Sequence, residues 1–268
     1  MPLGVRCHPE SMTTNQPHLA ARPAPHVLSK VPEVTLYFWV IKVLTTGMGE
    51  AASDFLAHRL GPITAVALSG VALVAALALQ FAVRRYVAGI YWTAVVMVSV
   101  SGTLTADAAH VGLGVPYLAS TAAFSVALAA VFALWHRSEG TLSIHSIFTR
   151  RREAFYWAAV LTTFALGTAA GDLTARTLGL GWFGSGVLFA VVIALPAVSR
   201  GFGLGEVPAF WWAYVVTRPL GASFADWLAV PRAQGGLGAG TGTVALGLTV
   251  LIVVFVASLA VGKRDVER

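Results

Sequence analysis

One sequence unit occurs four times along the chain at constant spacing. Each copy has an aromatic residue followed by Trp, then a glycine ten residues after the Trp, then an aspartate five residues after the glycine. The aromatic pairs are Phe38-Trp39, Tyr91-Trp92, Tyr156-Trp157 and Phe210-Trp211; the glycines are Gly49, Gly102, Gly167 and Gly221; the aspartates are Asp54, Asp107, Asp172 and Asp226. Because a carboxylate inside an apolar helix is costly, its fourfold recurrence predicts a functional site built from internal repeats.

Composition places the chain among integral membrane proteins. Hydrophobic residues make up 57% and charged residues 11% of its 268 positions, more apolar surface than a soluble domain of this length can bury. Eight apolar stretches have about the ~20 residues that a helix needs to cross a bilayer. They predict an all-α integral membrane fold with eight transmembrane helices, near residues 34–57, 63–83, 89–109, 115–135, 154–175, 182–199, 208–228 and 241–262.

We expect three regions along the chain. Residues 1–30 are rich in Pro, His, Thr and Ala without an apolar run, which predicts a disordered cytoplasmic tail. Residues 31–262 would form the transmembrane domain, and residues 263–268 a second cytoplasmic tail. The domain would contain four parallel two-helix repeats, at about residues 31–86, 87–150, 151–205 and 206–262.

The basic residues predict the orientation in the membrane. With eight spans, the two tails and the loops on their side hold thirteen Lys and Arg residues, whereas the opposite loops hold three, Arg59, Arg176 and Arg232. By the positive-inside rule, both termini are expected in the cytoplasm. The net charge of +6 is therefore mainly a topology signal. The chain lacks the folded basic face that nucleic-acid binding requires.

The ionisable residues of the predicted spans all belong to the odd-numbered spans. This distribution predicts that the odd-numbered helices line an interior and that the even-numbered helices mostly face lipid. Because all repeats begin on the same side, their aspartates are expected at similar depth, in the outer half of the membrane. The glycines would allow close helix approach. The ionisable residues are Lys42, Glu50, Asp54, Asp107, Asp172, Arg218 and Asp226.

Polar residues at helical spacing extend the aspartates into stripes. In the first repeat, Thr46, Glu50, Asp54 and His58 follow one another at four-residue intervals, which places them on one helix face. The other repeats offer Ser99, Thr103, Asp107 and His110; Thr168 and Asp172; and Arg218 and Asp226. Together with Lys42, these spans carry a formal charge of −3, which favours cations.

Several of these residues also have simpler interpretations. A single aspartate often caps a segment or binds a neighbouring Thr, although four in register disfavour that explanation. Lys42 is close enough to the cytoplasmic edge to extend toward it, which is the favoured interpretation; its alternative role is that of a coupling residue or counter-ion to the carboxylates. Arg218 is expected to pair with a carboxylate such as Glu50 or an aspartate, either as a structural ion pair or in coupling.

The histidines and the tryptophans are weaker indicators of a site. His58 and His110 follow aspartates at a spacing that suits shared ligation of manganese, iron or zinc. Only two repeats have such a histidine, so an exposed position at the membrane edge is the favoured interpretation. The tryptophans of the aromatic pairs are interpreted as anchors at the membrane interface.

Four segments of the chain resemble a family of bacterial membrane proteins that is defined as a four-copy repeat of unknown function. The segments run from Lys30 to Trp39, Thr45 to Asp54, Phe155 to Asp172 and Trp212 to Asp226, and the resemblance covers about residues 30–262. It implies eight helices and an inner-membrane location, without an established activity. The second repeat departs most from the others, with Ala106 where the third has Gly171.

These features predict a non-enzymatic secondary transporter or exporter of a cation, with a divalent metal as one candidate. The aspartate ring would bind the ion, and protonation of the same carboxylates would alternate with ion binding. The sequence has no nucleotide-binding motif, so an energy source other than ATP is expected. No cofactor is predicted. The partners would be the lipid bilayer and a small cation or proton; formation of a homo-oligomer is left open.

Two other functions stay open on the sequence. A passive cation channel would use the same aspartate ring without proton dependence. A membrane assembly or scaffold protein would need only a structural polar core. An intramembrane hydrolase ranks last, because the chain lacks a His-Glu-x-x-His motif and offers only Ser53 beside Asp54 as a weak nucleophile and base.

Overall fold

The computed structural model describes residues 29–199 and 205–262, and within these ranges the chain forms eight α-helices and no strand. The all-α fold is therefore confirmed. Residues 1–28 of the expected N-terminal tail and the expected C-terminal tail, residues 263–268, lie outside the described residues. The helices are α1 (Leu36–Leu60), α2 (Pro62–Ala82), α3 (Ala88–Asp107), α4 (Tyr117–Glu139), α5 (Arg150–Asp172), α6 (Gly181–Ser199), α7 (Glu206–Ala229) and α8 (Thr241–Gly262).

Local sequence explains several helix boundaries. Thr35 caps α1, since its hydroxyl accepts a hydrogen bond from the Phe38 amide at 3.4 Å, and Thr149 caps α5 in the same way. These hydroxyls satisfy amides that have no partner within the helix. Gly61, with a φ of 81°, ends α1, and Pro62 begins α2. A proline is tolerated there because the first helical amide has no acceptor within its helix.

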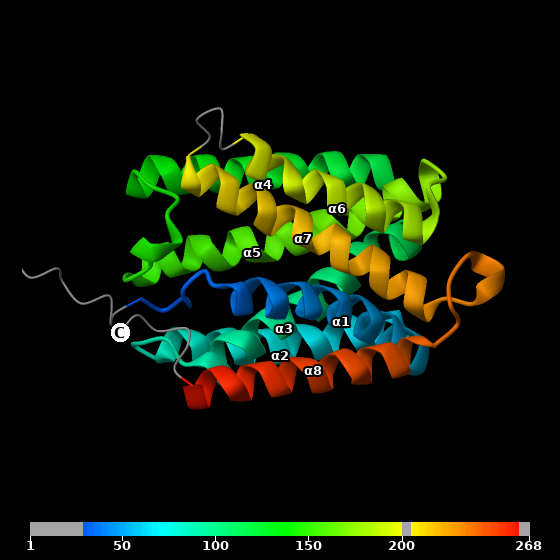
Figure 1. Ribbon diagram of the computed structural model, residues 1–268, viewed down its shortest axis with the longest axis horizontal. Coiled ribbons are helices and arrows are strands. Elements are labelled where there is room, and N and C mark those ends of the chain that lie inside the picture. The colour runs from blue at the N-terminus through cyan, green and yellow to red at the C-terminus, as the bar shows by residue number, and fades with distance from the viewer. Residues whose placement is uncertain (1–28, 200–204, 263–268) are drawn as a thin grey trace, which may run out of the picture.

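The odd-numbered helices form a closed ring, and the even-numbered helices lie outside it. α1 packs on α3, α3 on α5, α5 on α7, and α7 back on α1. Each outer helix packs chiefly on the next inner helix of the chain: α2 on α3, α4 on α5 and α6 on α7, while α8 closes the circle on α1. In Figure 1, α1, α5 and α7 all begin at the left-hand end of the bundle. The aspartates consequently lie toward one common end.

The recurring glycines lie where neighbouring ring helices touch. A Cβ added to any of the four would come within 3.0 Å of a side chain on the next ring helix. That side chain always belongs to the residue eight positions before the next aspartate. The pairs are Gly49 with Ser99, Gly102 with Phe164, Gly167 with Arg218, and Gly221 with Thr46. The absence of a side chain at each glycine thus sets the spacing of the ring.

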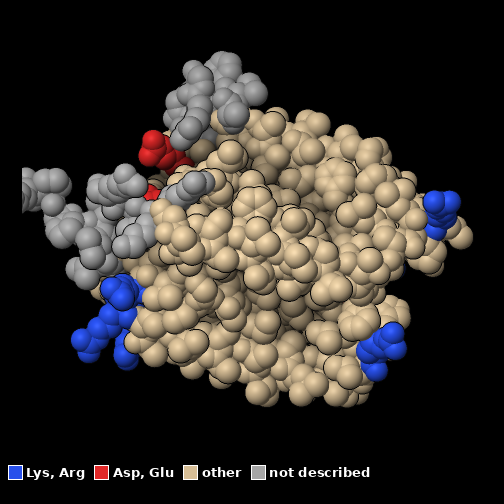
Figure 2. Space-filling view, turned by 60° about the horizontal axis from the view of Figure 1, so that its bottom comes forward, with Lys and Arg blue, Asp and Glu red and all other residues tan. Residues whose placement is uncertain are grey.

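The outer helices present the apolar surface. Five helices are long and apolar enough to cross a membrane: α2, α3, α4, α5 and α8, with α3 and α5 extended by their following turns. In the apolar windows of α2, α4 and α8, only 11% to 22% of residues are buried, against 61% and 67% for α5 and α3. Figure 2 shows a broad face without charged side chains between basic residues at its two ends. This surface is consistent with a helical membrane protein.

Residues 29 and 30 belong to the folded bundle, which corrects the expected boundary of the tail. Lys30 is buried, and its Nζ lies 2.6 Å from Glu153 Oε2 at the start of α5. Gln80 at the end of α2 donates to the other oxygen of the same carboxylate at 3.2 Å. The segment before α1 is therefore held against the start of α5 and the end of α2. A buried ion pair needs polar partners of this kind around it.

The aromatic pairs pack inside the bundle, which corrects the expectation of interfacial anchors. Trp92, Trp157 and Trp211 are 2%, 4% and 5% exposed, and their rings belong to one large core cluster. Trp211 also donates from its indole nitrogen to the Leu142 carbonyl at 2.9 Å. Each of these indole rings contacts a tyrosine ring, Tyr91 for Trp92 and Trp157 and Tyr214 for Trp211, so the large aromatic surfaces bury one another.

Candidate cation site

The polar stripes of the four repeats point into the ring. Steps of four residues keep side chains on one helix face, and counting back from each aspartate by four and by eight gives two sets of four residues. All eight are buried. The first set is Glu50, Thr103, Thr168 and Ala222, and the second is Thr46, Ser99, Phe164 and Arg218.

Arg218 on α7 connects all four ring helices. Its side chain is fully buried. Nη1 donates to the Thr46 carbonyl at 3.0 Å, and Nη2 donates to Glu50 Oε2 at 2.6 Å, to Thr168 Oγ1 at 2.8 Å and to Thr103 Oγ1. The expected pairing of Arg218 with a carboxylate is therefore observed. A buried guanidinium requires this kind of enclosure by acceptors.

Three carboxylates gather beside this ion pair. Glu50, Asp54 and Asp107 each place a carboxylate oxygen so that the three atoms lie within 4.8 Å of one another. Glu50 is buried, whereas Asp54 and Asp107 are half-buried, so the cluster is reachable from the aspartate end. We call these three residues the acidic cluster. Their oxygens are the type of ligand that hard cations such as Ca²⁺, Mg²⁺ and Mn²⁺ prefer.

The other two aspartates are placed differently. Asp172 on α5 accepts a hydrogen bond from Arg176 Nε at 3.1 Å, as an ion pair four residues apart. Asp226 on α7 is only 6% exposed. Among the described residues, metal-ligand spacing is found for the acidic cluster alone. The four aspartates are thus unequal in their contacts: ligand spacing joins Asp54 and Asp107 to Glu50. Asp172 and Asp226 lie within electrostatic range of these carboxylates, without that spacing.

Two π-helical turns begin directly after aspartates, and no sequence pattern predicted them. They are η2 (Ala108–Gly112) after Asp107 and η4 (Leu173–Thr177) after Asp172. π-Helical turns are rare and occur frequently at functional sites. The first of these turns follows a member of the acidic cluster. Arg176 lies in the second of these turns and pairs with Asp172, and His110 lies in the first.

Lys42 lies in the interior, which corrects the expectation that it reaches the membrane edge. Its side chain is 1% exposed, and Nζ lies 3.9 Å from the ring centre of Phe164 and 4.0 Å from that of Tyr214. Nζ has no hydrogen-bond partner among the described residues. The position is explained by helical spacing, because Lys42 precedes Asp54 by twelve residues and shares its inward face. Aromatic faces bind an ammonium group in such a site.

The histidines bind the backbone near the aspartate end. His58 Nδ1 lies 2.7 Å from the Asp54 carbonyl oxygen. His110 has a partner at each ring nitrogen: the Val115 carbonyl at 2.8 Å and the Ser120 hydroxyl at 3.2 Å. Neither histidine belongs to the acidic cluster. The geometry therefore gives the carboxylates, and not the imidazoles, the ligand spacing.

The opposite end of the ring is filled by aromatic side chains. Sixteen residues before each aspartate stand Phe38, Tyr91, Tyr156 and Phe210, which we call the aromatic layer. The hydroxyls of Tyr91 and Tyr156 share a hydrogen bond, and the ring centres of Phe38 and Phe210 lie 6.1 Å apart. Three of the four are at most 1% exposed. The ring interior is thus polar at one end and aromatic at the other.

A comparison with known families accounts for the fourfold pattern. A family model described as Repeat of Unknown Function (DUF347) matches residues 37–86, 90–141, 155–200 and 209–265. The chain belongs to this family. The four-copy repeat predicted from the sequence is therefore confirmed. No curated protein and no solved structure matches the chain.

Each DUF347 copy contains one inner helix and the outer helix that follows it. Because the outer helix packs chiefly on the inner helix of the next copy, the copies interlock around the ring. The family description assigns no activity, and three charged residues of the ring interior are not repeated. Glu50, Arg218 and Lys42 each occur in one copy only. Sequence reasoning missed Phe164 and Tyr214, although counting back in steps of four would have found both.

Proposed function

We propose that the chain is a secondary transporter of a divalent cation, which binds to the acidic cluster. The observation that carries this proposal is the approach of three carboxylate oxygens to within 4.8 Å of one another, inside a ring of membrane-type helices. Three hard oxygen ligands favour Mg²⁺, Mn²⁺ or Ca²⁺ over the soft metals that thiolates select. The proposal assigns no catalytic step to the chain.

Glu50 supplies a means of coupling in this proposal. The same carboxylate pairs with Arg218 at 2.6 Å and belongs to the acidic cluster. A cation that binds Glu50 therefore competes with Arg218 for the carboxylate. A proton on any of the three carboxylates in turn competes with the cation. Arg218 also donates hydrogen bonds to α3 and α5. Loss of its pair with Glu50 would therefore change the contacts among all four inner helices. Proton-linked exchange of the ion follows from this competition.

We place the protein in the bacterial inner membrane with both termini in the cytoplasm. The excess of basic residues on the side of the termini supports this orientation. The acidic cluster would then open toward the outer side, and the aromatic layer would close the ring toward the cytoplasm. An interior that is closed at one end supports a carrier over an open channel.

Transport in proteoliposomes tests the proposal. Wild-type protein is expected to carry Mn²⁺ at a rate that depends on a pH gradient, with protons moving in the opposite direction. Asp107→Asn removes one charged ligand and is expected to lower Mn²⁺ flux by about tenfold or more, since each tenfold change corresponds to about 1.4 kcal/mol of lost binding. Purified variants are first compared with wild type by thermal unfolding.

Glu139→Gln is the matched control, because Glu139 pairs with Arg152 outside the acidic cluster. This variant is expected to transport Mn²⁺ normally. Unchanged flux in the Asp107 variant would overturn the proposal. Mn²⁺ flux that ignores the pH gradient would point instead to a passive channel.

A further inference from the structure

A separate pocket lies beyond the aromatic layer, away from the acidic cluster. Its volume is about 280 Å³, close to the lower limit for ligand sites of about 300 Å³. Three parts of the chain form it: the segment before α1, the connection between α4 and α5, and the start of α7. The lining residues are Glu33, Val34, Leu142, Ser143, Ile144, His145, Glu206, Val207 and Phe210.

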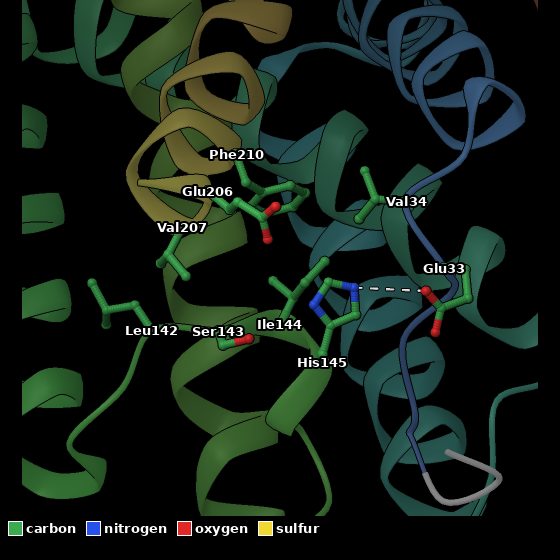
Figure 3. Close-up of a pocket in the computed structure, with 9 residues that line it drawn as sticks. All are labelled: Glu33, Val34, Leu142, Ser143, Ile144, His145, Glu206, Val207 and Phe210. Carbon is green, nitrogen blue, oxygen red and sulfur yellow. Dashed lines mark ion pairs between the residues drawn. The ribbon is translucent and has the colours of Figure 1, made fainter. Parts of the chain in front are cut away.

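The polar groups of the pocket are mainly acidic. Figure 3 shows the Glu206 carboxylate on one side of the pocket, across from His145 and Glu33. His145 Nε2 lies 3.6 Å from Glu33 Oε2, so one carboxylate has a partial partner within the pocket. Within the part of the chain that the structure describes, no Lys or Arg lines it. The pocket therefore selects against anions.

The remaining walls are apolar. Val34, Leu142, Ile144 and Val207 surround the carboxylates, and Phe210 contributes an aromatic ring. An aromatic face attracts a desolvated cation, above all a quaternary ammonium group. A neutral apolar molecule would desolvate the carboxylates without compensation, which is unfavourable. Two acids on an apolar wall therefore fit a molecule that has both a positive charge and an apolar body.

An inorganic ion fits this pocket less well. Among the described residues, the carboxylates and the imidazole of the pocket do not form a group with metal-ligand spacing, in contrast to the acidic cluster. From this geometry we infer that the pocket binds a small amphipathic organic cation, an amine or quaternary ammonium group attached to an apolar body. The site is independent of the proposed transport function, because it shares no residue with the acidic cluster.

Titration calorimetry on the purified full chain tests this inference, with benzyltrimethylammonium as the probe. Saturable binding is expected. Two analogues separate the contributions: tetramethylammonium lacks the apolar body, and benzyl alcohol lacks the charge. Each is expected to bind at least about tenfold more weakly than the probe, because each loses one of the two interactions.

Substitutions then assign the binding to the pocket. The variant with Glu33→Gln and Glu206→Gln is expected to bind the probe at least about tenfold more weakly. Glu139→Gln is the control, since it removes one negative charge at the end of α4 without lining the pocket, and it matches Glu206→Gln charge for charge. Thermal unfolding checks each variant, and Glu206→Gln alone serves if the double variant does not fold, because Glu206 is exposed.

Two results would overturn the inference. One is the absence of saturable binding to the wild-type chain. The other is the same affinity for the probe in the pocket variants and in the Glu139 variant. That result would mean that the probe binds the detergent or another part of the protein.

Discussion

The first two repeats and the last two use the same motif for different chemistry. In the first half of the chain, Asp54 and Asp107 lie with Glu50 in the acidic cluster. In the second half, Asp172 pairs with Arg176, and Arg218 occupies the ring interior. The glycine contacts, by contrast, are the same all around the ring. The motif therefore fixes the packing, and the residues that break the fourfold pattern decide which aspartates are free to bind a ligand.

The largest effect is expected on removal of Arg218, which joins the second half to Glu50 of the first. Arg218→Met leaves Glu50 buried without its ion pair, which costs about 3 to 5 kcal/mol for a buried pair. The thermal unfolding temperature of the purified protein should fall steeply. Arg176→Gln is the comparison, since Arg176 is 58% exposed in its pair with Asp172 and is expected to cost less than about 1 kcal/mol. Similar losses in both variants would contradict this account.

The glycine contacts predict a smaller effect on stability. A Cβ at Gly221 would lie 1.9 Å from Thr46 Oγ1 and 3.0 Å from the Val43 carbonyl oxygen. Gly221→Ala should therefore destabilise the ring by about 1 to 3 kcal/mol, as overpacking does. At Gly171, the nearest atom to an added Cβ is 3.8 Å away. Gly171→Ala should be close to neutral in the same unfolding assay, and a larger loss there than at Gly221 would refute the proposed packing role.

Ligand binding should distinguish the two halves directly. Asp107→Asn is expected to weaken Mn²⁺ binding by about tenfold or more, because a charged ligand becomes a neutral one. Asp172→Asn should weaken it less, since Asp172 lies outside the acidic cluster and pairs with Arg176. Equilibrium titration of the two purified variants gives the comparison. Equal effects would favour a ring of four equivalent aspartates.

The smallest effect is expected at Lys42. Lys42→Met keeps the length of the side chain and removes a buried amine that has no hydrogen-bond partner among the described residues. Replacing a buried polar group by an apolar one of similar shape is often neutral or stabilising. The unfolding temperature should stay level or rise slightly. A large fall would show that the contacts of Lys42 with the Phe164 and Tyr214 rings contribute more than this estimate allows.

Sequence periodicity predicted the helices well, since each apolar stretch had the length of a membrane span. It also predicted that the polar stripe occupies the odd-numbered helices. It could not predict the position of Lys42 or of the tryptophans, because both depend on side-chain packing between different helices. The inequality of the aspartates depends on ion pairs made across helices. A count along one helix cannot give such contacts.

Anomalous scattering at the manganese edge, from crystals of the protein grown with Mn²⁺, would show where the ion binds. We expect one strong peak within coordination distance of Glu50, Asp54 and Asp107, and its loss in the Asp107→Asn variant. A structure without a peak at the acidic cluster, or with the ion held by Asp172 and Asp226 instead, would contradict the account.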